Sequence, residues 1–347
     1  MKLLLISVLS NKTNGGIAIW TSRFLANCGV HDIDCHLVNT EMVGKRSENA
    51  TANRNIFDEL FRSFRIFRDT KNALRNNDFS AAHLNTSCGT FGLFRDYFVA
   101  LMIKKKGVRL ITHFHCDIPY WINNSLSRRC LGKLVSISDV NLVLCENSRQ
   151  YLEQQFGAIS HKVPNFLDSN VIRNDERKIN QILKTAFFVG RVEEAKGAKE
   201  IFEVAKRFPD INFRLAGEIS EVVSSWDKPN NVFLLGPLPH NEVLNEMDEA
   251  DVFIFPSHTE GFSLALAEAM ARGLPAIATN VGAAEDMLSD GCGCVVPVGD
   301  VEKIKSALEA FNDAQKREQL SYASITKAKK QYTTKAVVQK ILVYYVK

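Results

Sequence analysis

Two glutamates, Glu260 and Glu268, lie in the stretch PSHTEGFSLALAEAMARGLPAIATNVG, residues 256–282, with seven residues between them. The preceding run DVFIFPS is typical of a buried strand, and SLALAEAMARG of a helix with Ser263 as its N-cap and Gly273 as its stop. Glu260 is therefore predicted in the turn after the strand, and Glu268 inside the helix. Each carboxylate could accept hydrogen bonds from sugar hydroxyls. The structural alternatives are a surface turn residue for Glu260 and a buried carboxylate bound to a local amide for Glu268.

Backbone amides between the two glutamates add a second kind of binding group. The start of a helix leaves N–H groups without partners and favours negative charge. The amides of Phe262, Ser263 and Leu264, which follow Gly261, could therefore bind a sugar or phosphate oxygen.

Two cations follow an earlier strand candidate. TAFFVG runs into RVEEAKG, so Arg191 and Lys196 are predicted at the entry to a helix. Two cations at fixed spacing suit a diphosphate, because a guanidinium can make paired hydrogen bonds to phosphate oxygens. Ordinary solvated charges in a loop are an equally good explanation of this segment taken alone.

A glycine pair opens the first helix candidate. Gly15 and Gly16 follow the first strand, where a ligand can approach the backbone and the helix N-terminus favours phosphate. The pair is not the dinucleotide pattern GxGxxG, which disfavours a nicotinamide-dependent oxidoreductase. Asp32 and Asp34, which could imitate the acid of such a site, are interpreted as turn residues.

Two histidines end another strand candidate. His113 and His115 are two residues apart, so both side chains point to one face of a strand. A metal site would need a third ligand, and the sequence offers no convincing one. A structural role for one of the pair and a ligand-facing role for the other remain open.

The elements that position these residues alternate between strands and helices. The strand candidates are 2–9, 34–39, 79–85, 108–115 and 141–145, then 185–190, 211–217, 231–236, 251–257, 275–279 and 293–298. Segments with helical spacing, such as 199–208 and 301–311, lie between them. The pattern predicts an α/β fold of two Rossmann-like doubly wound domains facing across a cleft, with ligands at the carboxyl ends of the strands. The predicted domains are 1–165, 166–330 and a C-terminal helix in 331–347 that crosses back to the first domain.

Charge is divided unevenly along the chain. Residues 1–165 hold 21 Lys and Arg against 13 Asp and Glu, and the remainder holds 22 against 26. In the helix candidate 57–75, five apolar residues form one stripe: Phe57, Leu60, Phe61, Phe64 and Phe67. The helix could face the core with a solvated basic side, or contact anionic lipid headgroups. The residues predicted for such a membrane or acceptor face are Arg62, Arg65, Arg68, Lys104 and Lys105. Nucleic acid is disfavoured, because no aromatic-interleaved binding motif or helix-turn-helix pattern accompanies the charge.

Composition favours a cytoplasmic protein, with peripheral attachment to the inner face of the plasma membrane as an open possibility. The eight cysteines are scattered, which indicates reduced thiols rather than a disulfide framework. The apolar start of the chain favours a buried strand over a signal peptide, and no run is long enough to span a bilayer.

The motifs together resemble a known family. GRVEEAKG followed by FPSHTEGFSLALAEAMARGLPAIATNVGAAEDML is similar to the retaining GT-B glycosyltransferases of family 4, which carry an E-x7-E motif and an Arg and a Lys on the diphosphate. The resemblance covers most of 185–300. It is looser in the N-terminal half, through GGIAIW, ITHFHCD and VLCENSRQYL. VPNFLD resembles the family's usual IPNGVD, with Phe166 where glycine is common.

The resemblance implies a role for each residue. Glu268 would hold ribose hydroxyls, Glu260 the donor sugar, and the backbone near Leu238 the base. Arg191 and Lys196 would neutralise the diphosphate without a metal or other cofactor, and His115, less favourably His113, would face the sugar. Gly16 would line the glycine-rich loop.

The activity implied is transfer of a sugar from a nucleotide diphosphate sugar, with UDP-sugar favoured, to an acceptor hydroxyl. The acceptor would be a glycan or a lipid-linked glycan of bacterial surface polysaccharide assembly. A non-catalytic sugar-nucleotide-binding scaffold and a nucleotide-sugar epimerase or phosphorylase are the alternatives.

Overall fold

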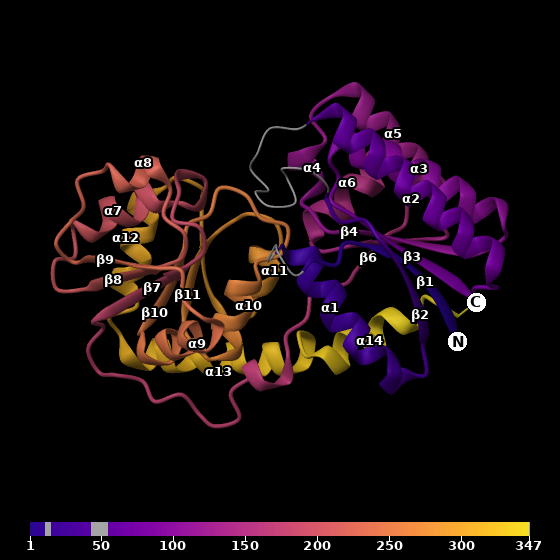
Figure 1. Cartoon of the computed structure of the whole chain (residues 1–347). Helices are drawn as coiled ribbons and strands as arrows, with labels where there is room; N and C mark the ends of the chain where they lie inside the picture. The colour runs from indigo at the N-terminus through magenta and orange to yellow at the C-terminus, as the bar shows by residue number, and fades with distance from the viewer. Residues whose placement is uncertain (11–14, 43–54, 347) are drawn as a thin grey trace. The chain divides into compact units, whose positions relative to one another are not determined.

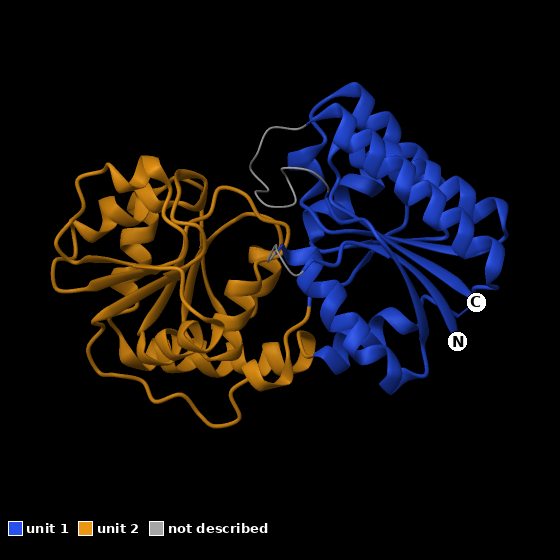
Figure 2. Cartoon of the chain, in the orientation of Figure 1, with its two compact units in different colours: residues 1–165, 334–347 blue, residues 166–333 orange. Residues whose placement is uncertain are grey.

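The computed structural model describes residues 1–10, 15–42 and 55–346, and divides the chain into two compact units. Unit 1 comprises 1–165 and 334–347, and unit 2 comprises 166–333 (Figure 2). The predicted α/β fold of two doubly wound domains is confirmed: each unit is built on one parallel six-stranded sheet with helices (Figure 1).

The sheet of unit 1 has the order β2-β1-β3-β4-β5-β6. Its strands are β1 (Lys2–Ser7), β2 (Asp34–Asn39), β3 (Ala81–Thr86), β4 (Arg109–Phe114), β5 (Val140–Val143) and β6 (His161–Lys162). The central strands are buried on both faces, which explains their near-continuous apolar runs. Strand β6 lies in the break predicted at 161–184, where two residues without an apolar run gave no strand signal.

Helices cover both faces of this sheet. They are α1 (Gly16–Cys28), η1 (Gly29–His31), α2 (Ile56–Asn76), α3 (Thr90–Lys105), α4 (Ile118–Trp121), α5 (Ser125–Ile137), α6 (Glu146–Phe156) and α14 (Thr334–Leu342). Helices α2, α3 and α5 lie together on one face, and α1 and α14 on the other (Figure 1). The C-terminal segment therefore returns to unit 1, where Tyr345 is buried against His83.

The sheet of unit 2 has the order β12-β11-β10-β7-β8-β9. Its strands are β7 (Thr185–Val189), β8 (Asn212–Ala216), β9 (Val232–Gly236), β10 (Val252–Phe255), β11 (Ala276–Thr279) and β12 (Gly293–Val296). The helical segments are η3 (Ser169–Val171), η4 (Glu194–Lys196), α7 (Ala198–Ala205), α8 (Glu221–Ser224), α9 (His240–Glu249), α10 (Leu264–Ala271), α11 (Ala284–Leu288), α12 (Val301–Ala310) and α13 (Ala314–Gln331). Helix α10 is buried on most of its circumference and packs on α13, so its sequence LALAEAMA is almost wholly apolar.

Two expectations about unit 1 are corrected. Four residues of the apolar stripe of α2 do not face the core, because Phe57, Leu60, Phe61 and Phe64 are exposed, while Phe67 packs against the core. In the part of unit 1 that the structure describes, no helix or strand buries these four side chains.

The prediction of reduced cysteines is wrong for one pair. Cys88 and Cys116 form a buried disulfide with their Cα atoms 6.5 Å apart. Each follows a strand, β3 or β4, and neighbouring parallel strands bring their carboxyl ends together. The other six cysteines form no disulfide, and four of them, Cys28, Cys130, Cys145 and Cys292, are buried.

Candidate active site

The candidate site of unit 2 lies at the carboxyl ends of β7 and β10, the two neighbouring central strands. Gly197 ends η4 with a φ of 81°, and a Cβ there would lie 2.2 Å from the carbonyl oxygen of Pro256. Gly282 has a φ of 53°, and a Cβ there would lie 2.3 Å from the carbonyl oxygen of Glu260. Both positions need glycine, since only glycine permits this backbone conformation and this closeness. The two loops are thereby held against the turn that carries Glu260.

An ion pair joins the two predicted motifs. The Lys196 ammonium lies 2.5 Å from Oε1 of Glu260 and 3.4 Å from the carbonyl oxygen of Thr259. The Ser257 hydroxyl also donates to Glu260, over 3.3 Å. Both side chains of the ion pair are largely buried, so water screens their charges only weakly. The structure therefore brings the lysine of one motif and the glutamate of the other into direct contact.

Glu268 projects from the second turn of α10. Its side chain is buried, and Oε1 lies 3.1 Å from Nε2 of His240, the first residue of α9. The structural alternative was a local amide partner for Glu268, but Oε1 contacts the imidazole of His240 instead. A second histidine–carboxylate pair, His258 with buried Glu200, lies 2.8 Å apart beside the same turn.

The N-terminus of α10 is built as the sequence predicts. The Ser263 side chain accepts a hydrogen bond from the amide of Leu266, over 3.1 Å, and so caps the helix. Phe262 is buried with its ring 5.5 Å from that of Tyr332, and the Gly261 carbonyl accepts from Ala283. This packing fixes the first turn of α10, whose amides carry partial positive charge.

Arg191 and Leu238 follow the carboxyl ends of β7 and β9. Arg191 follows β7, and its half-exposed guanidinium pairs with Glu193 over 3.0 Å. Leu238 follows β9 and is half-buried. Both residues stand at the edge of the sheet where the ion pair and α10 lie.

Several polar contacts of this site were missed from the sequence. They involve Glu193, Glu200, Ser257, His240 and His258. Among these residues, His240 alone could have been found from the sequence. It is a polar residue that begins a helix, directly after a strand and the turn Pro237–Leu238–Pro239. Glu193, Ser257 and His258 lie in loops and Glu200 in the first turn of α7, and no periodic pattern marks their contacts.

The predicted residues of unit 1 lie in a separate cluster. His115 is half-buried after β4, with Nε2 3.0 Å from Oδ1 of Asn85. Its ring centroid lies 4.0 Å from that of His113, and His113 lies 5.5 Å from His83, so the two predicted histidines share one face. Burial lowers the pKa of His115 and of His83 to about 3, and lowers that of His113 well below its usual value. All three imidazoles are therefore neutral at neutral pH.

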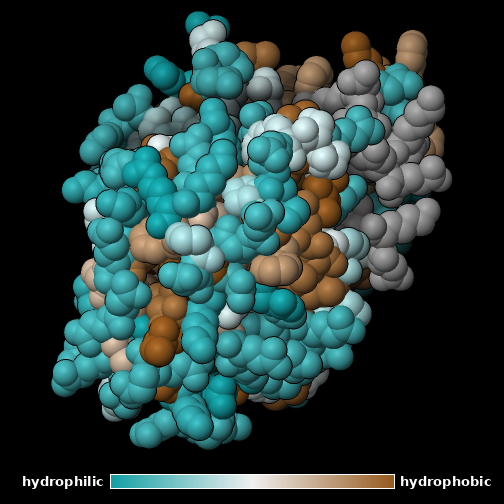
Figure 3. All heavy atoms as spheres, turned by 90° about the vertical axis from the view of Figure 1, so that its left-hand side faces the viewer, coloured by the Kyte–Doolittle hydropathy of each residue, from teal (hydrophilic) through white to brown (hydrophobic). Residues whose placement is uncertain are grey.

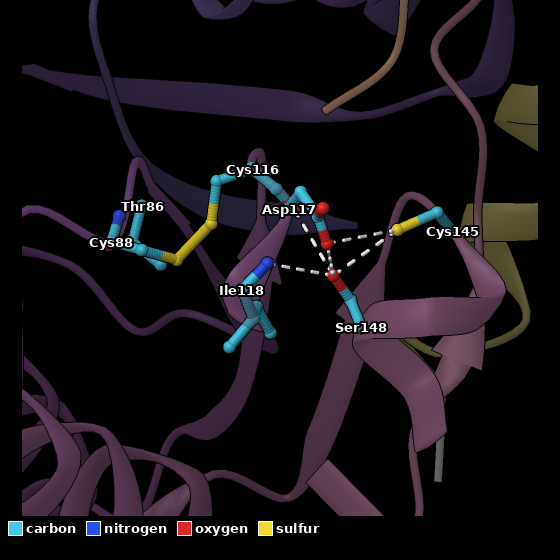
Figure 4. The surroundings of a disulfide bond; sticks show 7 residues. All are labelled: Thr86, Cys88, Cys116, Asp117, Ile118, Cys145 and Ser148. Carbon is cyan, nitrogen blue, oxygen red and sulfur yellow. Dashed lines mark hydrogen bonds between the residues drawn. A yellow bond between two sulfur atoms is a disulfide. The ribbon is translucent and has the colours of Figure 1, made fainter. Parts of the chain in front are cut away.

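The start of α1 and the disulfide lie at the carboxyl end of the same sheet. Gly16 begins α1, and no heavy atom of the described residues stands within 4 Å of the place of its missing Cβ. Beyond the disulfide, the Ser148 hydroxyl accepts from the Ile118 amide over 2.9 Å (Figure 4). Asp117 accepts from Asn147 over 3.1 Å. Burial raises the pKa of Asp117 above its usual value.

The five basic residues predicted for a membrane face are not equally available. Arg62 donates to the carbonyl of Thr40 and Arg65 to that of Glu41, which fixes both along the side of α2. Lys104 lies 2.7 Å from Asp139, and Arg68 lies 2.9 Å from Asp69. The structure thus commits most of these cations to intramolecular contacts, with Lys105 as the exception among the five.

Neither unit shows a set of metal ligands in the part of the chain that the structure describes: no group of three His, Cys, Asp or Glu side chains could hold an ion. Within the same residues, no helix is both long and apolar enough to cross a membrane.

The architecture and this edge of the second sheet together define the class of fold. The chain has the GT-B glycosyltransferase fold, with a TM-score of 0.79 to sucrose-phosphate synthase from Thermosynechococcus elongatus, at 14% identity over 99% of this chain and 98% of that one. Anabaena HepE, solved in complex with UDP and glucose, gives a TM-score of 0.70 at 14% identity over 99% and 98% of the two chains.

Sequence comparison adds the family of the second half. Residues 172–327, which contain the whole candidate site of unit 2, match the model of the family "Glycosyl transferases group 1". An uncharacterized 41.2 kDa protein in the cps region of Klebsiella pneumoniae is 24% identical over 87% of this chain and 88% of its own. The capsular polysaccharide biosynthesis glycosyltransferase CapM of Staphylococcus aureus is 26% identical over 50% of this chain and 49% of its own.

Proposed function

We propose that the chain is a retaining glycosyltransferase that transfers a sugar from a nucleotide diphosphate sugar, with UDP-sugar as the favoured donor, to an acceptor hydroxyl. The observation that carries the proposal is the Lys196–Glu260 ion pair beside the N-terminus of α10, inside the segment that matches the glycosyltransferase family. A cation, a carboxylate and a helix N-terminus suit a diphosphate bonded to a polyhydroxyl group.

Each group has a distinct task in this reaction. Lys196, Arg191 and the first-turn amides of α10 bind the diphosphate, and stabilise the negative charge that develops as the bond to the anomeric carbon breaks. Glu260 accepts hydrogen bonds from the donor sugar, Glu268 from the ribose, and the backbone near Leu238 contacts the base. The acceptor oxygen bonds to the anomeric carbon, and its proton passes to the leaving diphosphate.

Unit 1 would contribute the remaining groups. His115 is neutral, so it can donate or accept a hydrogen bond to the sugar without adding charge. Gly16, at the start of α1, would let a ligand approach the backbone. Retention of the anomeric configuration and the UDP preference follow from the resemblance to family 4 and from the UDP complex of the HepE structure.

The acceptor is proposed to be a glycan or lipid-linked glycan of surface polysaccharide assembly, handled in the cytoplasm at the inner face of the plasma membrane. Support comes from the relatives named for a cps region and for capsular polysaccharide biosynthesis. No metal is assigned a role, because Arg191 and Lys196 would neutralise the diphosphate. A chelator is therefore expected to leave turnover unchanged. Loss of turnover in the presence of the chelator would contradict this part of the proposal.

A donor panel tests the proposal. UDP-glucose, UDP-galactose, UDP-N-acetylglucosamine and GDP-mannose are each incubated with the purified chain, and nucleotide release is followed together with calorimetric binding of UDP and GDP. Release from one donor, lost in Glu260→Gln and retained in the surface variant Glu302→Gln, supports a transferase. Binding of UDP without release from any donor would indicate a sugar-nucleotide-binding scaffold, and an altered sugar still bound to its nucleotide would indicate an epimerase.

A further inference from the structure

Unit 1 carries a continuous aromatic surface on helices α2, α3 and α5. Phe64 is 65% exposed, Phe94 53% and Leu126 57%, although these are large apolar side chains. The Phe98 ring lies 4.9 Å from that of Phe94 and 6.4 Å from that of Phe67, so the rings form one connected row across α2 and α3. A connected exposed apolar surface of this kind marks an interaction site more often than scattered single residues do.

Unit 2 offers a contrast. Its large exposed apolar residues stand on separate elements: Ile182, Val222, Phe233, Val298 and Tyr322. The face of the molecule drawn in Figure 3 is mostly hydrophilic, with hydrophobic atoms in separate patches. The connected aromatic row of α2 and α3 therefore has no counterpart among these exposed residues of unit 2.

The aromatic surface contains two open grooves. The α2–α3 groove has a volume of about 630 Å³ and its apolar walls include Phe64, Phe67 and Phe98. The α3–α5 groove has a volume of about 600 Å³ and its walls include Phe94, Phe98 and Leu126. The Phe98 side chain is common to both, so the two grooves run on either side of one aromatic ridge.

Cations surround both grooves, and among the residues that the structure describes no Asp or Glu lines either one, although Arg68 is paired with the neighbouring Asp69. We call the six cations the cationic rim: Arg68, Lys71 and Lys105 at the α2–α3 groove, and Arg128, Arg129 and Lys133 at the α3–α5 groove. Lys133 lies 5.6 Å from the centre of the Tyr97 ring, which holds its charge beside the aromatic surface. Apolar grooves beside clustered positive charge match a layer that presents negative headgroups above hydrocarbon.

We infer that this face, the aromatic surface with its cationic rim, docks the protein on an anionic phospholipid bilayer. Phe64, Phe94 and Leu126 enter the boundary between headgroups and acyl chains, and the rim cations bind lipid phosphates. A second copy of the chain fits the face less well, because a self-complementary contact would bring the two cationic rims together. The inference deepens the proposed function by naming the surface that would bring the site to a lipid-linked acceptor.

Of the five basic residues first expected to contact membrane, the cationic rim includes only Arg68 and Lys105. Arg62 and Arg65 are bonded to backbone carbonyls, and Lys104 is paired with Asp139. Membrane affinity here comes from burial of apolar side chains together with the charges of the cationic rim. Removal of the Arg62 charge is therefore expected to have little effect on vesicle binding.

Vesicle co-sedimentation with the full chain tests the inference. Vesicles of equal parts phosphatidylcholine and phosphatidylglycerol are compared with vesicles of phosphatidylcholine alone. The aromatic variant is Phe64→Ser/Phe94→Ser/Leu126→Ser, and its matched control is Val222→Ser/Val298→Ser/Tyr322→Ser, three exposed apolar residues of unit 2. The rim variant is Lys71→Gln/Lys105→Gln/Lys133→Gln, and its control is Lys178→Gln/Lys199→Gln/Lys303→Gln, which removes equal charge from exposed positions of unit 2.

Binding to the anionic vesicles alone is expected, weakened roughly tenfold or more by the aromatic variant and by the rim variant. Both controls should keep wild-type binding. Absence of binding by the wild type, or equal losses in the variants and their controls, would overturn the inference. So would a wild-type dimer in solution that the aromatic variant converts to monomer without any vesicle binding. Because no sugar nucleotide is present, these outcomes do not depend on whether the proposed transferase activity is correct.

Discussion

Two parallel sheets of equal size end in different chemistry. At the carboxyl ends of β7 and β10 in unit 2, Lys196 and Glu260 form a largely buried ion pair with further charged groups beside it. In unit 1, Asn85 and His113 lie in the carboxyl halves of β3 and β4, with His83 in the middle of β3, and all three are buried and uncharged. The same fold can therefore place charged or neutral polar groups near the carboxyl ends of its strands. The residues of the strand ends and of the loops that follow them determine which kind is present.

The difference has a physical consequence for each unit. A charged edge whose groups are fixed by loop packing can bind an anionic diphosphate with little rearrangement. A neutral buried edge can bind hydroxyls through hydrogen bonds, but any protonation there costs stability because burial disfavours charge. Substitutions in unit 2 should therefore alter turnover most, and substitutions in unit 1 should alter the pH dependence of stability.

The largest effect is expected at the ion pair. Lys196→Met removes the cation proposed to neutralise the leaving diphosphate, and nucleotide release from the accepted donor should fall roughly 100- to 1000-fold. Glu302→Gln is the matched control, since it breaks an exposed ion pair with Arg207 in the same unit. Full turnover by Lys196→Met would show that the charged edge of unit 2 is not the reacting site.

The second prediction compares two glycines of unit 2, and separates the cost of a steric clash from the cost of a positive φ. Gly197→Ala places a Cβ against Pro256 at a φ of 81°, whereas Gly291→Ala meets no atom within 4 Å at a φ of 74°. We expect the first to lower the free energy of unfolding by about 3 kcal/mol and the second by about 1 kcal/mol. Urea unfolding followed by the fluorescence of Trp226, which packs 5.6 Å from Phe202 in α7, measures both. Equal losses of unfolding free energy in the two variants would show that the close contact of Gly197 with Pro256 does not contribute to the cost.

The fold could be predicted because periodicity encodes it. Every strand candidate from 2–9 to 293–298 is a strand in the structure, and each end differs from the prediction by at most two residues. Strand β6 could not be found, because two residues carry no period. The apolar stripe of α2 carried the right period for a helix. Periodicity does not say whether an apolar face meets the core or another surface.

The candidate site could be predicted only in part. Glu260, Ser263 and Glu268 were placed on their turn and helix because caps and stops are local signals. The ion pair of Lys196 with Glu260 and the contact of His240 with Glu268 join residues from separate elements, so they depend on loop geometry that a single sequence does not display. The disulfide between Cys88 and Cys116 was missed for the same reason. Whether these residues bind a donor sugar remains a prediction for the experiments.

The third prediction uses the neutral histidines of unit 1. The folded pKa of His83 is about 3, below its unfolded value of about 6.5, so between these values the unfolded chain binds more protons. Stability should therefore fall as pH drops below about 6.5, by about 1.4 kcal/mol per pH unit for each such histidine. His83→Gln should reduce the slope of unfolding free energy against pH by the contribution of one histidine. Denaturant unfolding is followed by Trp20, whose ring lies 5.1 Å from His83, in a Trp121→Phe/Trp226→Phe background.

The control for the pH prediction is His36→Gln. His36 is exposed on β2, outside the buried cluster, so its loss should leave the slope unchanged. A slope that does not respond to His83→Gln would mean that the buried imidazoles do not govern the acid stability of unit 1.

The smallest effect concerns the helix cap at the candidate site. Ser263→Ala removes the hydroxyl that accepts from the Leu266 amide, and should lower the free energy of unfolding by about 1 kcal/mol. Ser220→Ala removes the equivalent bond to Val223 at the start of α8 and should cost a similar amount. Only Ser263→Ala should also weaken UDP binding in calorimetry, since only α10 begins beside the Lys196–Glu260 pair. Equal UDP affinity in the two variants would mean that the first turn of α10 does not contact the diphosphate, and would leave Lys196 and Arg191 as its proposed ligands.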